Sequence, residues 1–212
     1  HDVHVYAATA TLDGTGVKWR HVPVPALPTV LRVPLFSLLS TALIKRRDYD
    51  AVVGQGINTL AGDYMVVHTT NAARRDVFYA LCQDGLSLSW LRRCEQRLWY
   101  LYAATAERLL LGRESLAVVA VSTGVARELR RYYPYVSPAR VKVVFNGVDP
   151  EEFAVRAAAG ARRRLYAELA LPPDAAVLLF VGGLWWQKGL REVIAALTLL
   201  PERFHLLVVG KG

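Results

Sequence analysis

Short apolar runs separated by longer amphipathic stretches form the main pattern of this chain. Apolar runs of about four to eight residues are typical of strands in a buried parallel sheet. The strand candidates, in chain order, are the residues around Val3 and Val5, then 17–24, 49–53, 64–67, 116–121, 141–145, 176–181 and 204–209. Most of them are followed by glycine, proline or a small polar residue, which favours a turn at that point.

Amphipathic helical patterns fill the segments between these strands. The helix candidates are residues 31–45, 90–110, 125–133, 155–170 and 190–197. Strand and helix patterns alternate along the whole chain. This alternation predicts an α/β, Rossmann-like fold, with a mostly parallel sheet and helices on both of its faces.

The longest helical pattern covers residues 90–110. Its apolar stripe consists of Leu91, Cys94, Leu98, Leu101, Thr105 and Leu109. A stripe with this spacing predicts a helix that packs against the core through these residues. The aromatic residues of the segment are interpreted as part of the same packing, because RNA binding requires stacking aromatics beside basic residues on an exposed face. We therefore predict no nucleic-acid partner.

The composition is that of a folded protein in a reducing compartment. The 212 residues are 53% hydrophobic and 21% charged, which excludes an extensively disordered chain. Cys82 and Cys94 are the two cysteines, and their spacing matches neither a disulfide scaffold nor a zinc site. No apolar run reaches the roughly 18 to 20 residues that a membrane-spanning helix needs. These features together predict a cytoplasmic protein.

The formal net charge is +8, and most of it lies in the first part of the chain. Residues 1–149 contain 18 basic and 12 acidic residues, whereas residues 150–212 contain 8 and 6. This surplus suits an acidic partner, namely anionic lipid, a phosphorylated glycan or nucleic acid, although a high pI also serves solubility alone. Segment 31–47 is apolar and ends in Lys45, Arg46 and Arg47. It is interpreted either as a packed helix with a basic C-terminus or as a helix on an anionic membrane surface.

Segment 176–200 carries the strongest candidate chemistry. Its strand pattern ends at Gly182 and Gly183, and its helical pattern begins directly after Lys188 and Gly189. Glycines let the backbone approach an anion, and a helix N-terminus presents unpaired N–H groups and the positive end of its dipole. Spacing alone leaves two interpretations open, a phosphate site or a βα turn with a solvated lysine. The segment matches neither a P-loop nor a dinucleotide-binding motif.

Two sequence blocks together resemble a known family. V-K-V-V-F-N-G-V-D-P-E-E-F at 141–153 and F-V-G-G-L-W-W-Q-K-G-L at 180–190 closely resemble the central landmarks of glycosyltransferase family 4. A-V-S-T-G-V-A-R-E-L at 120–129 is similar to a third segment of that family. The resemblance implies a GT-B fold. Residues 1–149 would form an acceptor-side domain without its first strand, and residues 150–212 would begin the domain that binds the nucleotide-sugar donor.

The resemblance also implies roles for particular residues. His68 ends a predicted strand. Its position alone is compatible with a structural or a functional role. Members of the family often carry a histidine here that faces the sugar. The implied catalytic residues are His68 and Lys188. The implied donor-diphosphate site is Gly182, Gly183, Lys188 and Gly189. The implied cleft residues are Gly54, Gly56, Thr69, Ser122 and Thr123, and the implied hinge is Asn146 and Gly147. The expected partners are a nucleotide-diphosphate sugar, a glycan or lipid-linked acceptor and an anionic membrane surface, with no cofactor and no metal.

Two departures from the family pattern limit this resemblance. Gly183 stands where the family commonly has an arginine, and the family's paired glutamates would lie beyond Gly212. We interpret the chain as a fragment trimmed at both ends and expect it to be inactive alone. The alternative interpretation is a non-catalytic, basic Rossmann-like module that binds a phosphorylated ligand or a membrane surface.

Overall fold

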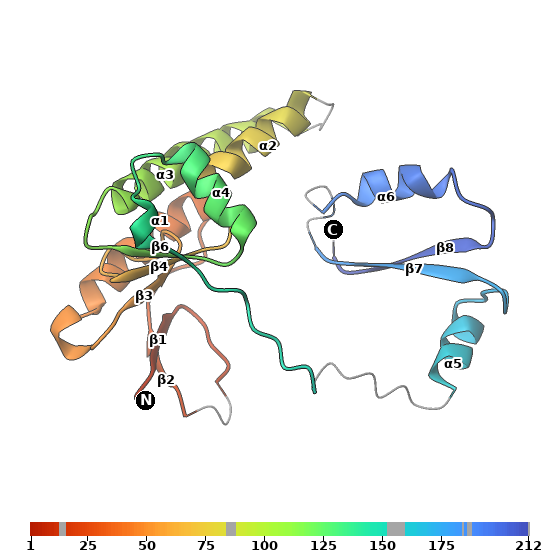
Figure 1. Ribbon diagram of the computed structural model, residues 1–212, viewed down its shortest axis with the longest axis horizontal. Coiled ribbons are helices and arrows are strands. Elements are labelled where there is room, and N and C mark those ends of the chain that lie inside the picture. The colour runs from red at the N-terminus through yellow and green to blue at the C-terminus, as the bar shows by residue number, and fades with distance from the viewer. Residues whose placement is uncertain (13–15, 84–87, 152–159, 184, 186–187, 212) are drawn as a thin grey trace. The chain divides into compact units, whose positions relative to one another are not determined.

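Two compact units make up the chain in the computed structural model, which describes residues 1–212 except 13–15, 84–87, 152–159, 184, 186–187 and 212. The first unit is His1–Val148 and the second is Asp149–Gly212 (Figure 1). The first unit contains β1 (His4–Ala7), β2 (Lys18–His21), α1 (Thr29–Leu43), η1 (Arg46–Asp48), β3 (Val53–Gln55), β4 (Tyr64–Val67), α2 (Asn71–Gln83), α3 (Trp90–Leu111), β5 (Ala117–Ala120), α4 (Thr123–Tyr132), η2 (Pro138–Arg140) and β6 (Val141–Val143). The second contains α5 (Ala161–Glu168), β7 (Ala176–Val181), α6 (Leu190–Leu197) and β8 (Phe204–Val209).

Every described strand pair is parallel, which confirms the predicted α/β fold. Strands β3, β4, β5 and β6 form one sheet in that order, β1 pairs with β2, and β7 pairs with β8. Strands β4, β7 and β8 begin and end at the predicted residues. Strand β3 starts later than predicted, so that Gly54 lies inside the strand rather than in the loop after it. The predicted helix 155–170 appears as α5, and residues 155–159 lie outside the described part of the chain.

The core of the first unit lies between the central strands and helices α3 and α4. Met65 of β4 faces Val118 of β5 in the sheet register, and both side chains are buried. Residues of α3 and α4 pack on these strands and complete a single cluster with Leu110, Leu111, Val125, Ala126 and Leu129. A sheet with mostly apolar central strands needs this cover on its faces. The carboxyl ends of β3, β4 and β5 lie at one edge of the sheet.

Helix α3 packs through a different face from the predicted one. Its buried residues are Tyr100, Ala103, Glu107, Leu110 and Leu111, and Trp99 and Tyr102 pack partly against the core. The predicted stripe, from Leu91 to Leu109, is exposed instead. The prediction of packing aromatics is thus confirmed for Trp99, Tyr100 and Tyr102, whereas Trp90 is exposed. Helix α3 therefore has two apolar faces, one directed to the core and one directed outward.

Helix α1 packs against α3 within the first unit. The basic cluster that follows it does not cap it. Ser40 is buried and donates a hydrogen bond to the carbonyl of Asn58. The helix ends at Leu43, and its last turn contains no basic residue. The prediction that Lys45, Arg46 and Arg47 complement its dipole is therefore wrong. Arg46 instead forms an ion pair with Asp63, with a 2.8 Å distance between Nε and Oδ1.

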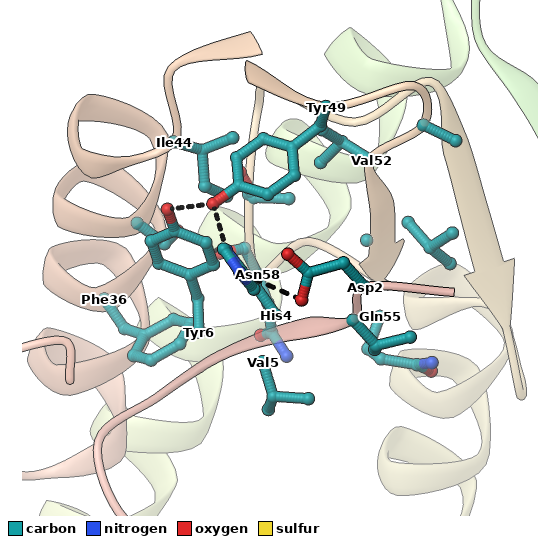
Figure 2. A pocket seen from close by; sticks show the side chains of 16 residues that line it. Asp2, His4, Val5, Tyr6, Phe36, Ile44, Tyr49, Val52, Gln55 and Asn58 are labelled. Carbon is teal, nitrogen blue, oxygen red and sulfur yellow. Dashed lines mark hydrogen bonds and ion pairs between the residues drawn. The ribbon is translucent and has the colours of Figure 1, made fainter. Parts of the chain in front are cut away.

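A cavity of about 580 Å³ separates β1 from β3 (Figure 2). Five successive residues of each chain segment, 2–6 and 51–55, line it. Successive side chains of a strand point to opposite faces of its sheet. Because every residue of these two segments lines the cavity, the cavity lies along the edges of the strands rather than against one face. Phe36, Ser40 and Ile44 of α1 also line the cavity.

The backbone pattern shows that both edges are open toward this cavity. The carbonyls of Val3 and Ala7 accept hydrogen bonds from the segment that contains β2, so the backbone groups of His4 and Tyr6 face away from β2. On the other side, the carbonyl of Val52 accepts a hydrogen bond from Tyr64, so the backbone groups of the next residue, Val53, face away from β4. Side chains bridge the two edges where a strand would otherwise pair.

A short chain of side-chain hydrogen bonds makes this bridge. The hydroxyl of Tyr49 lies 2.8 Å from both the Tyr6 hydroxyl and the Nδ1 atom of His4 (Figure 2). Burial and the neighbouring Tyr49 hydroxyl raise the pKa of Tyr6 to about 12. The other ring nitrogen of His4, Nε2, is buried and makes no hydrogen bond among the described residues, but it lies 3.6 Å from Oδ1 of Asp2 (Figure 2).

Candidate functional site

Two glycine-containing turns meet at the carboxyl ends of β7 and β8. Gly210 follows β8 with φ of +146°, and a Cβ atom on it would lie 2.1 Å from the carbonyl oxygen of Gly182. Gly182 follows β7, and its amide donates a hydrogen bond to the carbonyl of Val209. A Cβ atom on Gly183 would lie 3.1 Å from the carbonyl oxygen of Lys211. The backbones approach so closely here that a side chain at Gly210 has no room.

Lys188 lies beside this turn, at the start of α6. The Cγ atom of Lys188 would be 3.7 Å from a Cβ atom built on Gly182, and the lysine side chain is exposed. Gly189 precedes the helix in the left-handed conformation, with φ of +77°. The indole N–H of Trp185 donates to the carbonyl of Gly182 at 3.0 Å, and the amide of Leu190 donates to the carbonyl of Trp185. Trp185, which the sequence interpretation did not assign, closes the turn.

The electrostatics of this turn combine a cation, a helix N-terminus and one acid. Lys188 and the positive end of the α6 dipole favour an anion at the end of β7, although the amide of Leu190 is already bonded to Trp185. Glu192 occupies the first turn of α6, and its Oε2 would lie 3.5 Å from a Cβ atom on Gly189. The predicted residues Gly182, Gly183, Lys188 and Gly189 thus come together in one unit.

Replacing Gly210 with alanine tests the close approach of the two turns. The new methyl group would overlap the carbonyl of Gly182, and φ of +146° is strained for any residue with a Cβ atom. We expect a loss of about 2 to 4 kcal/mol in the free energy of unfolding of the second unit, measured by urea denaturation. Gly160→Ala is the matched control, because Gly160 lies in the same unit and also has a positive φ, of +81°, but a Cβ atom there meets nothing within 4 Å. Equal midpoints for the two variants would contradict the predicted overlap.

His68 lies at the carboxyl edge of the first sheet, directly after β4. It is exposed, and its Nε2 atom lies 3.4 Å from Oε1 of Gln55, the last residue of β3. Gly56 forms the turn after β3 with φ of +58°, and its amide donates to the carbonyl of Val66. Gly54 is buried within β3, where a Cβ atom would lie 3.1 Å from Cγ2 of Thr59. Gly54 therefore serves the packing of β3, whereas His68 and Gln55 present polar atoms at the edge.

Two glutamates, the buried Glu107 and the half-buried Glu128, accept hydrogen bonds from the loop after His68. Glu128 of α4 accepts hydrogen bonds from the Thr70 amide at 3.0 Å and the Thr69 hydroxyl at 3.2 Å. Glu107 of α3 accepts from the Asn71 amide at 2.8 Å. These carboxylates occupy the N-terminus of α2, so its first amides already have anionic partners within the protein.

Glu107 is the most deeply buried acid of this group. Its carboxylate also accepts hydrogen bonds from the Asn71 side-chain amide and the Tyr133 hydroxyl. Burial raises the pKa of the Glu107 carboxyl, and the hydrogen bonds from Tyr133 and Asn71 partly offset this rise. Sequence reasoning missed Glu107, although an acid directly after the aromatic and alanine residues of 99–106 is a visible signal of a buried, hydrogen-bonded carboxylate.

The remaining predicted cleft residues follow β5, and the predicted hinge residues follow β6. Ser122 caps α4, because its hydroxyl accepts a hydrogen bond from the Val125 amide at 3.1 Å, and Thr123 is exposed in the first turn. Asn146 and Gly147 are exposed after β6, just before the boundary between the units at residue 148. The carboxyl ends of the strands therefore gather the residues predicted for the first unit, apart from Gly54 and the pair Asn146–Gly147. Among the described residues, no group of His, Cys, Asp and Glu side chains could hold a metal ion.

Comparison with known proteins identifies the family. Residues 1–152 match Glycosyltransferase Family 4. The chain is 30% identical over 101 residues to an uncharacterized glycosyltransferase of Methanocaldococcus jannaschii, a match that covers 47% of this chain and 26% of the relative. It is 38% identical over 80 residues to the alpha-maltose-1-phosphate synthase of Mycolicibacterium smegmatis, which covers 38% and 20%.

A further relative and a solved structure extend this comparison. The D-inositol 3-phosphate glycosyltransferase of Xylanimonas cellulosilytica is 38% identical over 96 residues, which is 44% of this chain and 23% of the relative. The crystal structure of WaaG, a glycosyltransferase involved in lipopolysaccharide biosynthesis, shares the fold with a TM-score of 0.73 and 21% identity, over all of this chain and 56% of WaaG. These matches cover about a quarter or less of the curated relatives. Because the family match extends over most of the chain, the protein belongs to glycosyltransferase family 4.

Proposed function

We propose that this chain is part of an enzyme that transfers a sugar from a nucleotide-diphosphate sugar to a glycan or lipid-linked acceptor, with retention at the anomeric carbon. The observation that carries the proposal is the position of Lys188 beside Gly182, where β7 ends and α6 begins. In open parallel sheets, ligands bind outside the carboxyl ends of the strands. A diphosphate in this position would meet both the lysine and the helix N-terminus.

The reaction would require positive charge at this position. When the bond between the sugar and the diphosphate breaks, negative charge grows on the leaving diphosphate and positive charge grows on the sugar ring. Fixed positive groups that face the leaving group stabilise this transition state without having to reorganise. In our proposal, Lys188 and the amides at the start of α6 supply that charge, and the proposal needs no metal ion for this step.

His68 is proposed to face the sugar or the acceptor. It lies at the carboxyl edge of its sheet, and Gln55 is within reach of one ring nitrogen. A histidine in this setting can donate a hydrogen bond to a sugar hydroxyl, or accept a proton from an acceptor hydroxyl. Glu107 and Glu128 hold the following loop and are proposed to position His68 rather than to contact the substrate.

The names of the relatives support an acceptor that carries phosphate or lipid. One makes alpha-maltose-1-phosphate, another acts on D-inositol 3-phosphate, and WaaG is involved in lipopolysaccharide biosynthesis. We accordingly propose a role in cell-envelope polysaccharide synthesis, in the cytoplasm, with peripheral attachment to the inner face of the membrane. None of the described helices has the length and apolar character required to cross a bilayer.

A transfer assay with the full-length protein tests this function. A panel of nucleotide-diphosphate sugars is incubated with a membrane-lipid extract, and the anomeric configuration of the product is measured by NMR. We expect transfer with retention for one donor, and no transfer by the 212-residue chain alone, because a transferase cleft must hold the donor and exclude water. Binding of phosphorylated sugars without transfer to any acceptor would support the non-catalytic module instead.

A further inference from the structure

The turns that follow β7 and β8 lie against each other, and each of them leads to an exposed lysine. Val181 and Val209, the last residues of the two strands, face each other in the sheet register. Two residues further along both strands, a Cβ atom on Gly183 would lie 3.1 Å from the carbonyl oxygen of Lys211. The two chain segments therefore stay adjacent past the strand ends, and Lys211 lies beside Gly183.

Lys188 lies at the same turn, next to the neighbouring glycine. Its Cγ atom would be 3.7 Å from a Cβ atom on Gly182, which directly precedes Gly183. The side chain of Lys188 and the main chain of Lys211 therefore lie beside adjacent residues of one turn. Within the part of the chain that the structure describes, neither lysine forms an ion pair with a carboxylate.

The carboxyl ends of β7 and β8 carry an excess of positive charge. Asp174 precedes β7 and Glu202 precedes β8, so both of these acids lie at the amino ends of the strands. Glu192, in the first turn of α6, is the acid nearest in sequence to Lys188. The carboxyl ends thus bring Lys188 and Lys211 together with a single acid from α6. A surface with an excess of one sign of charge attracts a ligand of the opposite sign, which here is an anion.

The glycine at position 183 gives a reason for a cation on the turn after β8. Family 4 glycosyltransferases commonly have an arginine at this position, whereas Gly183 has no side chain. A side chain at 183 would begin 3.1 Å from the Lys211 carbonyl, so the turn after β8 would have to move slightly to admit it. This chain has its additional cation on that neighbouring turn instead.

We propose that Lys211 is a second cation of the donor site and contacts the diphosphate together with Lys188. The inference rests on the proposed function, because it concerns the same ligand at the same turn. A nucleotide-diphosphate sugar carries negative charge on both phosphates, and more charge develops on the diphosphate as the sugar departs. A single ammonium group balances only part of that charge. Lys211 supplies a further positive group where the charge grows, which is where such a group lowers the barrier.

Binding of a nucleoside diphosphate to the full-length protein tests this role without requiring transfer. UDP, GDP, ADP and dTDP are titrated by isothermal calorimetry, and the one that binds most tightly is used with each variant. Lys211→Ala should weaken its binding about tenfold, as expected for one charge pair lost near the surface. The affinity of this variant should also depend less steeply on salt, because fewer charges are screened. Lys211→Arg keeps a cation that binds phosphate and should retain most of the parental affinity.

Arg203→Ala is the matched control, because it removes the same charge from the opposite end of β8. At about 3.3 Å per residue, Arg203 lies about 25 Å along the strand from Lys211, well beyond the Debye length of about 10 Å in 0.1 M salt. This variant should leave the affinity and its salt dependence unchanged. Urea denaturation checks that Lys211→Ala keeps its stability, as expected for a change at an exposed side chain.

Other results would count against Lys211. Parental affinity in Lys211→Ala, beside a clear loss in Lys188→Ala, would overturn the inference and leave the proposed function in place. A loss of affinity that Lys211→Arg does not restore, or that leaves the salt dependence unchanged, would mean that Lys211 only shapes the turn. Failure of the parent protein to bind any of these diphosphates would contradict the proposed donor site, and the role of Lys211 with it.

Discussion

Replacing Lys188 with alanine is expected to lower the turnover of the full-length transferase by about 10² to 10³, the range for losing one preorganised stabilising group. The lysine lies beside Gly182 at the start of α6. If it neutralises the leaving diphosphate, its contribution is larger in the transition state than in the ground state, so turnover should fall more than donor affinity. Steady-state kinetics at saturating donor measures this effect.

The control for Lys188→Ala must remove a similar charge without touching the turn. Arg203→Ala meets this condition, because Arg203 precedes β8 at the opposite end of the strand and stacks on the Phe204 ring. Lys211 is less suitable, since its carbonyl would lie 3.1 Å from a Cβ atom on Gly183. Folding of Lys188→Ala should be nearly unchanged, because the side chain is exposed. Parental turnover in Lys188→Ala would favour the solvated-lysine interpretation.

Replacing Glu107 with alanine is expected to cost about 2 to 4 kcal/mol in the free energy of unfolding, since buried neutral donors that lose their acceptor cost about 1 to 3 kcal/mol each. The change leaves the Tyr133 hydroxyl and the Asn71 amide without their acceptor. Glu107→Gln keeps one acceptor oxygen and should cost much less. Urea denaturation of the two variants measures the difference, and equal losses would mean that side-chain volume, rather than hydrogen bonding, is what matters.

The pH dependence of stability gives a second test of Glu107. Burial raises the folded-state pKa of this carboxyl above its ordinary value of 4.5. The folded state then binds the proton more tightly than the unfolded state, so the resulting stabilisation is complete below about pH 4.5 and is lost as the pH rises through the raised pKa. The parent should therefore lose stability relative to Glu107→Gln over this interval. A difference between them that stays constant with pH would show that Glu107 does not titrate there.

The hydrophobic pattern predicted the central strands well because burial on both faces leaves an unambiguous signal. Strands β4 and β7 were located to the residue. Strand β3 was placed too early, since its middle residue is Gly54, and glycine contributes no apolar signal. For α3, the spacing of apolar residues predicted the helix but not the face that is buried. Leucines lie along one face, and aromatic and alanine residues lie along the other, which is the one that packs on the core. A periodic pattern cannot tell which of two apolar faces meets the core.

The candidate sites were predictable where glycine is needed for a positive φ. Gly182 and Gly189 mark the turn at Lys188, and both adopt positive φ. The carboxylates of Glu107 and Glu128 were not predicted, because their partners are backbone amides distant in sequence. Thr69 is predicted to line the cleft, and its hydroxyl also donates to Glu128, which its position in the sequence does not indicate. Sequence position indicates which end of a strand a residue occupies, whereas the direction of its hydrogen bonds depends on tertiary packing.

The open edges of β1 and β3 imply that the first unit does not unfold as one cooperative block. Among the described residues, β1 and β2 form backbone ladders only with each other, and the hydrogen bonds of Tyr49 with His4 and Tyr6 connect them to the remainder. A two-stranded sheet is marginally stable by itself. The strand pair should open at a much lower free energy than β4 and β5, and its amide protons should exchange with solvent first. The β1–β2 pair is thus a part of the first unit that unfolds locally. It is distinct from the slowly exchanging core around Met65 and Val118.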